Sequence, residues 1–183
     1  RMANHSKSKR PTDHRMKQND CLTFILFVCT ANRFRSPLAE AYFKKMLTTI
    51  GAAQTWRVES AGTWVSQSLP PTPEAIEEAE KRNLDITAHL SRSINETLLS
   101  QADLILVMES GQKEALTNEF PEIKRKIYLL TEICGGLPYN LPDPYVTHDP
   151  PAQIAREIEE LIENKFNCIY HYFVQKTVNV NKT

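Results

Sequence analysis

The stretch that decides the fold is VCTANRFRSP, residues 28–37. Cys29 ends an apolar run, five residues separate it from Arg35, and Ser36-Pro37 has the pattern of a helix start. The N–H groups of such a loop and of a helix N-terminus form an electropositive seat for a tetrahedral oxyanion. Arg35 adds a planar fork for two phosphate oxygens, and the same surroundings stabilise a thiolate. A structural cysteine beside a surface arginine is the alternative, but it leaves the spacing unexplained.

Short apolar runs alternate with helical patterns on either side of this stretch. Such alternation is typical of βαβ units around a parallel sheet. Strands are predicted over residues 23–28, 55–60, 103–108 and 126–130. Helices are predicted from Ser36 to Gly51, from Pro73 through residue 79, over residues 93–99, up to Leu116, and over residues 154–173. Residues 135–151 contain too many prolines and glycines for regular structure. The order predicts a single layered α/β domain.

Composition narrows the class of protein. The 183 residues suit one domain, and 41% hydrophobic with 24% charged residues is the balance of a soluble globular chain. No apolar run is long enough to span a bilayer. Because 22 basic residues offset 22 acidic ones, no global field favours nucleic acid. The four cysteines, at positions 21, 29, 134 and 168, fit neither a disulfide framework nor zinc spacing. Together with the lack of a secretory segment, they predict a reducing cytoplasm.

The ends of the chain differ from its middle. Residues 1–20 hold six basic and two acidic residues without apolar periodicity, which predicts a disordered basic tail. Either this tail is a plain extension, or it is a weak docking arm for acidic partners. We expect the domain to cover residues 21–175 and residues 176–183 to be a flexible end.

Phosphoryl transfer to sulfur also needs a proton for the departing oxygen. A carboxylic acid can supply it and then act as a base toward water. Composition alone does not choose among the acidic residues. Asp143 is a candidate because Pro142 and Pro144 flank it, although prolines beside an aspartate also mark ordinary turns.

Several motifs together resemble the low-molecular-weight protein tyrosine phosphatase family. The resemblance runs from about residue 23 to the last helix and implies a three-layer domain with a four-stranded parallel sheet flanked by helices on both faces. It implies Cys29 as nucleophile, Arg35 as phosphate clamp and Asp143 as general acid, with no cofactor or metal. The phosphate-binding loop would be Cys29, Thr30, Ala31, Asn32, Arg33, Phe34 and Arg35. The motifs are Cys29-x5-Arg35-Ser36-Pro37, Leu38-Ala39-Glu40-Ala41, Ser60-Ala61-Gly62-Thr63, residues 102–108, and Asp143-Pro144-Tyr145.

The resemblance also implies support for this loop. Asn32 would take a left-handed backbone conformation, which asparagine adopts more readily than most residues. Ser36, Ser60 and His89 would brace it by hydrogen bonds, and Ser36 would assist departure of the thiolate. From the residues alone, His89 also reads as an ordinary, partly buried histidine.

The substrate is the least determined property. Arg33 stands where relatives that act on phosphotyrosine tend to carry an aliphatic residue and arginine phosphatases carry threonine. A cation there would repel a guanidinium and favour phosphotyrosine near acidic residues, unless Arg33 points into solvent. Tyr145 and Trp64 are candidate pocket walls, and Val146 replaces a second aromatic residue. Phosphorylated proteins are therefore the expected partners, with phosphotyrosine ahead of phosphoarginine.

Other functions fit less well. Arsenate reductases of this fold relay oxidation through further cysteines in mid-chain, and none lies between Cys29 and Cys134. A non-catalytic phosphopeptide-binding relative would not need a nucleophile and an acid together. The pair His148-Asp149 lacks metal-ligand spacing and reads as a turn. Phe34 occupies the position of a second cysteine that shields the nucleophile in many relatives, so we expect peroxide to oxidise Cys29 irreversibly unless another thiol reaches it.

Overall fold

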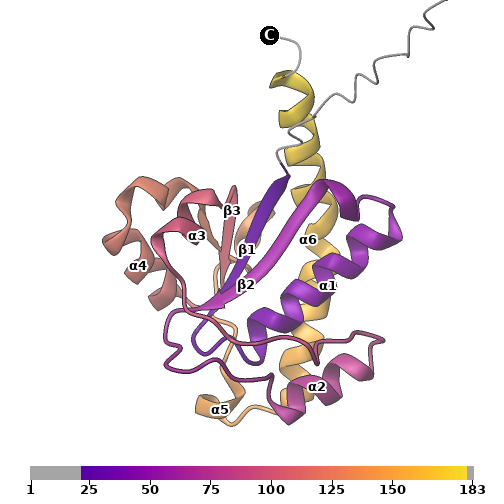
Figure 1. Cartoon of the computed structure of the whole chain (residues 1–183), viewed down its shortest axis with the longest axis vertical. Helices are drawn as coiled ribbons and strands as arrows, with labels where there is room; N and C mark the ends of the chain where they lie inside the picture. Colours follow the sequence, from indigo (N-terminus) through magenta and orange to yellow (C-terminus); the bar gives the residue numbers. More distant parts are fainter. Residues whose placement is uncertain (1–21, 181–183) are drawn as a thin grey trace, which may run out of the picture.

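The computed structural model describes residues 22–180 as an α/β domain of three layers. The strands β1 (Thr23–Cys29), β2 (Trp56–Gly62), β3 (Leu104–Val107) and β4 (Ile127–Leu129) form one parallel sheet in the order β2-β1-β3-β4. This arrangement confirms the predicted four-stranded parallel sheet. In Figure 1 the sheet stands between α1 and α6 on one side and α3 and α4 on the other.

Six α-helices and three short 3-10 helices surround the sheet in the described residues. The α-helices are α1 (Arg35–Thr49), α2 (Pro73–Glu80), α3 (Glu96–Gln101), α4 (Ser110–Glu119), α5 (Pro144–Thr147) and α6 (Pro151–Val180). The 3-10 helices are η1 (Ala53–Thr55), η2 (Pro121–Lys126) and η3 (Ile133–Gly135). Within residues 22–180, no helix is both long and apolar enough to cross a membrane.

The central strand β1 divides the core into two halves. Side chains alternate across a strand, so Ile25, Phe27 and Cys29 face α1 and α6. The side chains of Phe24, Leu26 and Val28 face α3 and α4. Phe27 is fully buried, and burying one such side chain contributes about 2 kcal/mol to stability. The nucleophile candidate thus ends a strand whose position is fixed on both faces.

The end of β2 is packed against the loop that follows β1. A Cβ atom on Gly62 would lie 2.5 Å from the backbone oxygen of Thr30, so only glycine allows this approach. Beyond Gly62 the pairing continues, because Thr63 N donates to Cys29 O (2.9 Å) and Trp64 N donates to Thr30 O (3.0 Å). The second strand therefore supports the loop directly.

Three local predictions were wrong. α1 begins at Arg35 with Phe34 as its N-cap residue, and Ser36 lies inside the helix because its hydroxyl bonds to Cys29 and Asn32 instead of capping. α3 begins at Glu96, where the side chain of Asn95 caps Leu98 N. Residues 135–151 do contain a helix, α5.

The prediction that the cysteines form no disulfide was also wrong. Cys134 of η3 and Cys168 of α6 are bonded to each other. The prediction failed because 34 residues separate the two cysteines, and only the packing of α6 against η3 brings them together. α6 itself continues to Val180, past the residue at which the expected domain ends. The predicted basic tail and residues 181–183 lie outside the described residues.

Candidate active site

Residues 29–35, called the Cys loop below, connect β1 to α1 at the carboxyl end of the sheet. The Sγ atom of Cys29 accepts a hydrogen bond from Asn32 N (3.2 Å) and lies 2.9 Å from Ser36 Oγ. Ser36 Oγ accepts from Asn32 Nδ2 (2.9 Å), so its own hydrogen is free to point at the sulfur. Phe34 caps α1 without a side-chain bond, which leaves the first N–H groups of the helix free to face an anion. The loop therefore holds the Cys29 sulfur between Asn32 N and the Ser36 hydroxyl, at the start of α1.

Asn32 fixes the shape of the Cys loop. Its φ is 56°, in the left-handed region that few residues adopt without strain. Its side chain donates to Ser36 Oγ and to Ser60 Oγ (2.9 Å), and it accepts from Arg92 N (3.0 Å). His89 Nε2 lies 2.8 Å from the carbonyl oxygen of Asn32 and must donate its hydrogen there. The structure thus brings Asn32, Ser36, Ser60 and His89 together.

The guanidinium of Arg35 is 1% exposed and joins three segments of the chain. Its Nη1 atom donates to Leu141 O (2.9 Å) and forms an ion pair with Glu109, which follows β3. Its Nη2 atom bonds to Asp143 Oδ2 (2.6 Å) and lies 3.4 Å from Thr30 Oγ1. Arg35 therefore joins the Asp143 carboxylate to the loop that contains Cys29.

Asp143 belongs to the connection between β4 and α6, residues 131–147, called the acid segment below. It is the N-cap residue of α5, and its Oδ1 accepts from Tyr145 N (3.0 Å). Pro144 suits the first helical position that follows. The side chain of Asp143 is 19% exposed, so it reaches both Arg35 and solvent. A carboxyl group in this position can exchange protons with a leaving group and with water.

Aromatic and charged side chains lie next to the Cys loop. The ring of Tyr145 lies edge-on to that of Phe34, with 6.1 Å between centroids, and its hydroxyl donates to Glu74 Oε2 of α2 (2.7 Å). Burial and this bond to a carboxylate raise the pKa of Tyr145 to about 12. Arg33 is half-buried, and its Nε donates to Pro70 O (2.8 Å). Arg33 is near enough to Tyr145 for its charge to act on the tyrosine hydroxyl.

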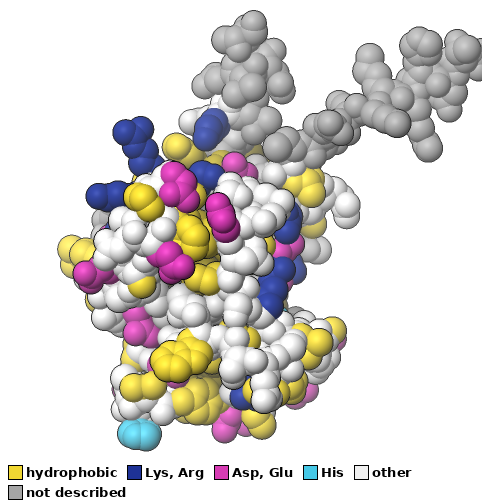
Figure 2. All heavy atoms as spheres, turned by 60° about the vertical axis from the view of Figure 1, so that its left-hand side comes forward, with side chains coloured by type: hydrophobic (Ala, Val, Ile, Leu, Met, Phe, Trp, Pro, Cys, Tyr) yellow, Lys and Arg dark blue, Asp and Glu magenta, His cyan; other side chains and the backbone are white. Residues whose placement is uncertain are grey.

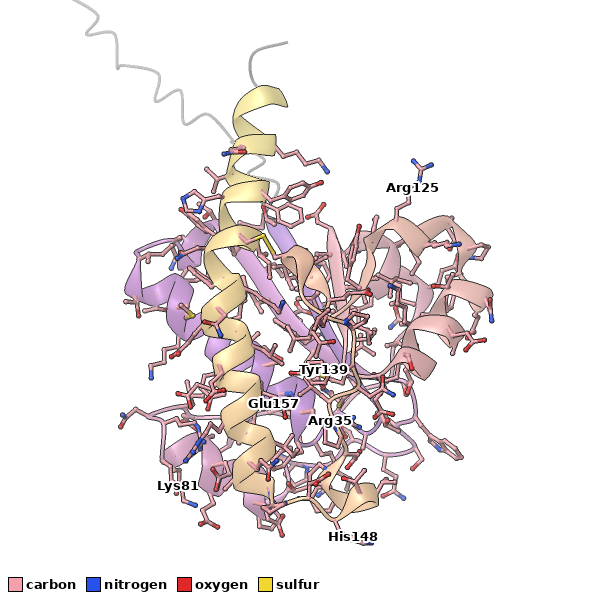
Figure 3. All side chains as sticks on the ribbon, turned by 180° about the vertical axis from the view of Figure 1, so that it is seen from behind. Arg35, Lys81, Arg125, Tyr139, His148 and Glu157 are labelled. Carbon is pink, nitrogen blue, oxygen red and sulfur yellow. A yellow bond between two sulfur atoms is a disulfide. The ribbon has the colours of Figure 1, made fainter. Side chains whose placement is uncertain are left out.

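Trp64, a predicted pocket wall, is placed less closely than Tyr145, and His148, which was read as part of a turn, lies apart from the site. The backbone of Trp64 pairs with the Cys loop, but its side chain is 78% exposed and makes no ring contact with Tyr145. His148 is exposed at the end of α5 with a φ of 62°, and in Figure 3 it lies at the lower edge of the molecule, away from Arg35. Across residues 22–180, no three His, Cys, Asp or Glu side chains are grouped to hold a metal.

Sequence reasoning did not assign roles to Glu40, Arg92, Glu109 or Gln112. Ser60 Oγ donates to Glu40 Oε2 (2.6 Å), which extends the hydrogen-bond chain from Asn32. Gln112 accepts from Met108 N and Glu109 N and donates to Thr30 Oγ1 (3.1 Å). A signal for Glu109 was present, because it directly follows a buried strand and the carboxyl ends of parallel strands form such sites.

The face of the molecule drawn in Figure 2 carries side chains of both charges. On the face shown in Figure 2, Lys and Arg side chains project mainly from the upper part, acidic side chains lie among them, and hydrophobic side chains are prominent lower down. The mixture agrees with a net charge of zero.

Comparisons with known proteins agree with this geometry. Residues 24–179 match the family "Low molecular weight phosphotyrosine protein phosphatase". The chain is 34% identical to a protein-arginine-phosphatase of Bacillus subtilis over 139 residues, 75% of this chain and 91% of that protein. It is 32% identical to the human low molecular weight phosphotyrosine protein phosphatase over 128 residues, 68% of this chain and 81% of that protein.

A solved structure is also similar along most of its length. It is a YwlE arginine phosphatase whose active-site cysteine is replaced by a phosphorylated serine, with a TM-score of 0.69 and 31% identity, covering 76% of this chain and 90% of that one. The chain belongs to the low-molecular-weight phosphotyrosine protein phosphatase family.

Proposed function

We propose that this protein hydrolyses phosphotyrosine in proteins through a phosphocysteine intermediate. The observation that carries the proposal is one connected set of contacts: Asn32 N donates to Cys29 Sγ, and Arg35 joins the Cys loop to Asp143. The Cys29 thiolate attacks phosphorus while Arg35 binds two of the phosphate oxygens. Asp143 gives its proton to the departing phenolate oxygen.

The second step uses the same groups in reverse roles. The Asp143 carboxylate takes a proton from water, and the resulting oxygen nucleophile attacks the phosphocysteine. The S–P bond breaks, inorganic phosphate leaves, and the thiolate returns. The hydroxyl of Ser36, 2.9 Å from Cys29 Sγ, donates to the sulfur as its negative charge reappears. No metal or cofactor takes part in the proposed steps.

An aryl phosphate is the substrate that the side chains next to the Cys loop favour. The Tyr145 ring, held by Glu74 and Phe34, offers a wall on which a phenyl ring can pack. The Arg33 guanidinium beside it repels a cationic substrate group and attracts acidic residues near the phosphotyrosine. Trp64 is a second, exposed candidate for contact with the substrate protein.

Protein-arginine phosphatase activity is the second candidate, because a relative with that name is 34% identical to this chain. Rates on matched phosphotyrosine and phosphoarginine peptides separate the two. We expect the phosphotyrosine peptide to react faster, and Arg33→Thr to narrow the difference. An unchanged ratio would remove Arg33 from the explanation of specificity.

Hydrolysis of p-nitrophenyl phosphate in the presence of a chelator tests the proposed chemistry. We expect turnover by the unaltered protein and none by Cys29→Ser, which should still bind phosphate. A protein that binds phosphopeptides without turnover would instead be the non-catalytic relative. A relay of arsenate-reductase type is disfavoured, because the described residues pair Cys134 with Cys168 and leave Cys29 free.

Two predictions from the sequence stay proposals. The first is a phosphatase domain over residues 21–175 with flexible ends, which limited proteolysis tests. The second is a cytoplasmic location, against which the Cys134–Cys168 disulfide counts if the compartment is permanently reducing. Trapping the thiols in intact cells before lysis would decide whether the disulfide forms there.

A further inference from the structure

A disulfide fixes the start of the acid segment to the last helix. Cys134 lies in η3 and Cys168 near the middle of α6, and both residues are exposed. Figure 3 shows the bond in yellow between α6 and the short helix. A small dithiol can therefore reach this bond without unfolding the protein.

Non-covalent contacts join the same two elements. The Nζ atom of Lys165, whose residue is 7% exposed, donates to Ile133 O (2.7 Å). A Cβ atom on Gly136 would lie 2.6 Å from that Nζ, so the chain passes close to α6 here. Further along, burial and a hydrogen bond with Glu157 raise the pKa of Tyr139 to about 12. Figure 3 shows Tyr139 and Glu157 side by side, with Arg35 below them.

Between Cys134 and Asp143, hydrogen bonds hold the acid segment at two points. Thr131 Oγ1 donates to Tyr139 O (2.7 Å) and accepts from Tyr139 N (3.1 Å), which closes the loop that contains Cys134. Leu141 N then donates to Met108 O (2.9 Å), and Leu141 O accepts from Arg35. Asp143 follows two residues later. Residues 137–140 are all exposed between these points, so the attachment at Cys134 helps to set the position of the segment.

We propose that Cys134 and Cys168 are positioning residues for Asp143, and that reducing their disulfide slows proton transfer at the active site. The inference rests on the proposed function, because it concerns the acid of that reaction. Reduction should leave the surroundings of the sulfur unchanged, since the hydrogen bonds of Cys29 and Asn32 do not involve residues 133–140. The Cys loop contacts the acid segment only beyond these residues, through Phe34 and Arg35. Reduction should therefore affect the proton-dependent part of the chemistry more than phosphate binding.

The redox step needs a dithiol and is otherwise balanced. A thiolate of the dithiol attacks one sulfur, the S–S bond breaks, and a mixed disulfide forms. The second thiol of the reagent displaces the remaining cysteine. Two electrons and two protons end on Cys134 and Cys168 as thiols, and the reagent becomes a cyclic disulfide.

Leaving groups of different basicity test the proposal. We would measure kcat/KM for phenyl phosphate, whose leaving group needs a proton, and for p-nitrophenyl phosphate, whose leaving group needs it less. Dithiothreitol should lower the phenyl phosphate value by about tenfold, the order expected from a small displacement of a catalytic group. The p-nitrophenyl phosphate value should change by less than about twofold, because proton donation contributes little to its rate. Denatured thiol titration must show two more thiols after reduction.

Matched variants separate positioning from general stabilisation. The double variant Cys134→Ser/Cys168→Ser should behave like the reduced protein and ignore dithiothreitol, which also controls for effects on Cys29. In Asp143→Asn, dithiothreitol should change kcat/KM for phenyl phosphate and for p-nitrophenyl phosphate by the same factor, because this variant has no acid whose position could change. The melting temperature of the unaltered protein should fall by about 10 °C on reduction, as expected for a 34-residue loop.

The outcomes distinguish this proposal from the proposed function. Equal loss with both substrates, no loss with either, or an unchanged thiol count would overturn the positioning role while hydrolysis itself stands. Absence of turnover in every sample, with the thiol count and melting temperature responding as expected, would instead overturn the proposed function and this inference with it.

Discussion

The Cys loop and the acid segment supply the two halves of the proposed chemistry, but they are held in different ways. The Cys loop is mostly buried, and the side chain of Asn32 bonds at every polar atom. The acid segment is largely exposed and depends on partners far away in sequence: Arg35, Glu74 and Cys168. The nucleophile is therefore preorganised by a buried network that joins contacts within the loop to Ser60, His89 and Arg92, whereas the acid lies on a largely exposed segment.

Of the changes that test this difference between the two regions, oxidation of Cys29 should cause the largest loss of activity. Phe34, and not a second cysteine, precedes Arg35 in the Cys loop. Cys134 and Cys168 are bonded to each other, so neither can trap an oxidised Cys29 as a disulfide. We expect peroxide to abolish activity and dithiothreitol to restore only a minor part. Mass spectrometry should find sulfinic or sulfonic acid at Cys29. Full recovery would mean that another thiol, such as Cys21, reaches the loop.

Removing the acid should have the next largest effect. Asp143→Asn keeps the shape of the side chain but cannot donate a proton in the same way, so kcat should fall by about 10²- to 10⁴-fold. Because Arg35 and the Cys loop remain, the inhibition constant of inorganic phosphate should change little. Steady-state kinetics with phosphate as inhibitor measure both. A comparable loss of phosphate binding would show that Asp143 also contributes to the phosphate site formed by Arg35 and the Cys loop.

Substitution of Asn32 tests how far the Cys loop relies on its own contacts. Asn32→Ala loses the side-chain hydrogen bonds and strains the positive φ, and should lower the free energy of unfolding by about 2–4 kcal/mol. Asn32→Gly loses the same bonds without the strain, so it should be about 1 kcal/mol more stable than Asn32→Ala. Urea unfolding measures the difference, and kcat/KM should fall in both. Equal stability of the two variants would argue against backbone strain.

The contact between Glu74 and Tyr145 should have the smallest effect. Glu74→Ala removes the acceptor of the Tyr145 hydroxyl and should raise KM for a phosphotyrosine peptide about threefold through loss of one hydrogen bond, with kcat unchanged. Tyr145→Phe should do the same, and the double variant should add little. Glu77→Ala, on the same helix and paired with Lys81, is the matched control. An equal rise of KM in the control would assign the effect to charge alone.

The two regions were also predicted from the sequence to different degrees. Periodicity and the Cys29-to-Arg35 spacing predicted β1, the loop and α1, because these depend on neighbours in sequence. The family resemblance, not the residues alone, selected Asp143 among the acidic residues. The same reasoning missed α5, whose cap involves Asp143 itself, and the ion pair of Arg35 with Glu109, which requires β3 to lie beside β1. Ser36 was misread as a cap because its bond to sulfur is invisible in sequence.

The absence of a side chain at Gly62 has a consequence for how this molecule tolerates variation. Even a methyl group there would collide with the Thr30 carbonyl, and relieving that collision would push apart the two neighbouring backbone segments. The hydrogen bonds that the N–H groups of residues 63 and 64 donate to Cys29 O and Thr30 O would then lengthen. The backbone that carries the Cys29 sulfur would shift as a result. Gly62 therefore sets how closely β2 approaches the Cys loop, although it makes no contact with the Cys29 sulfur.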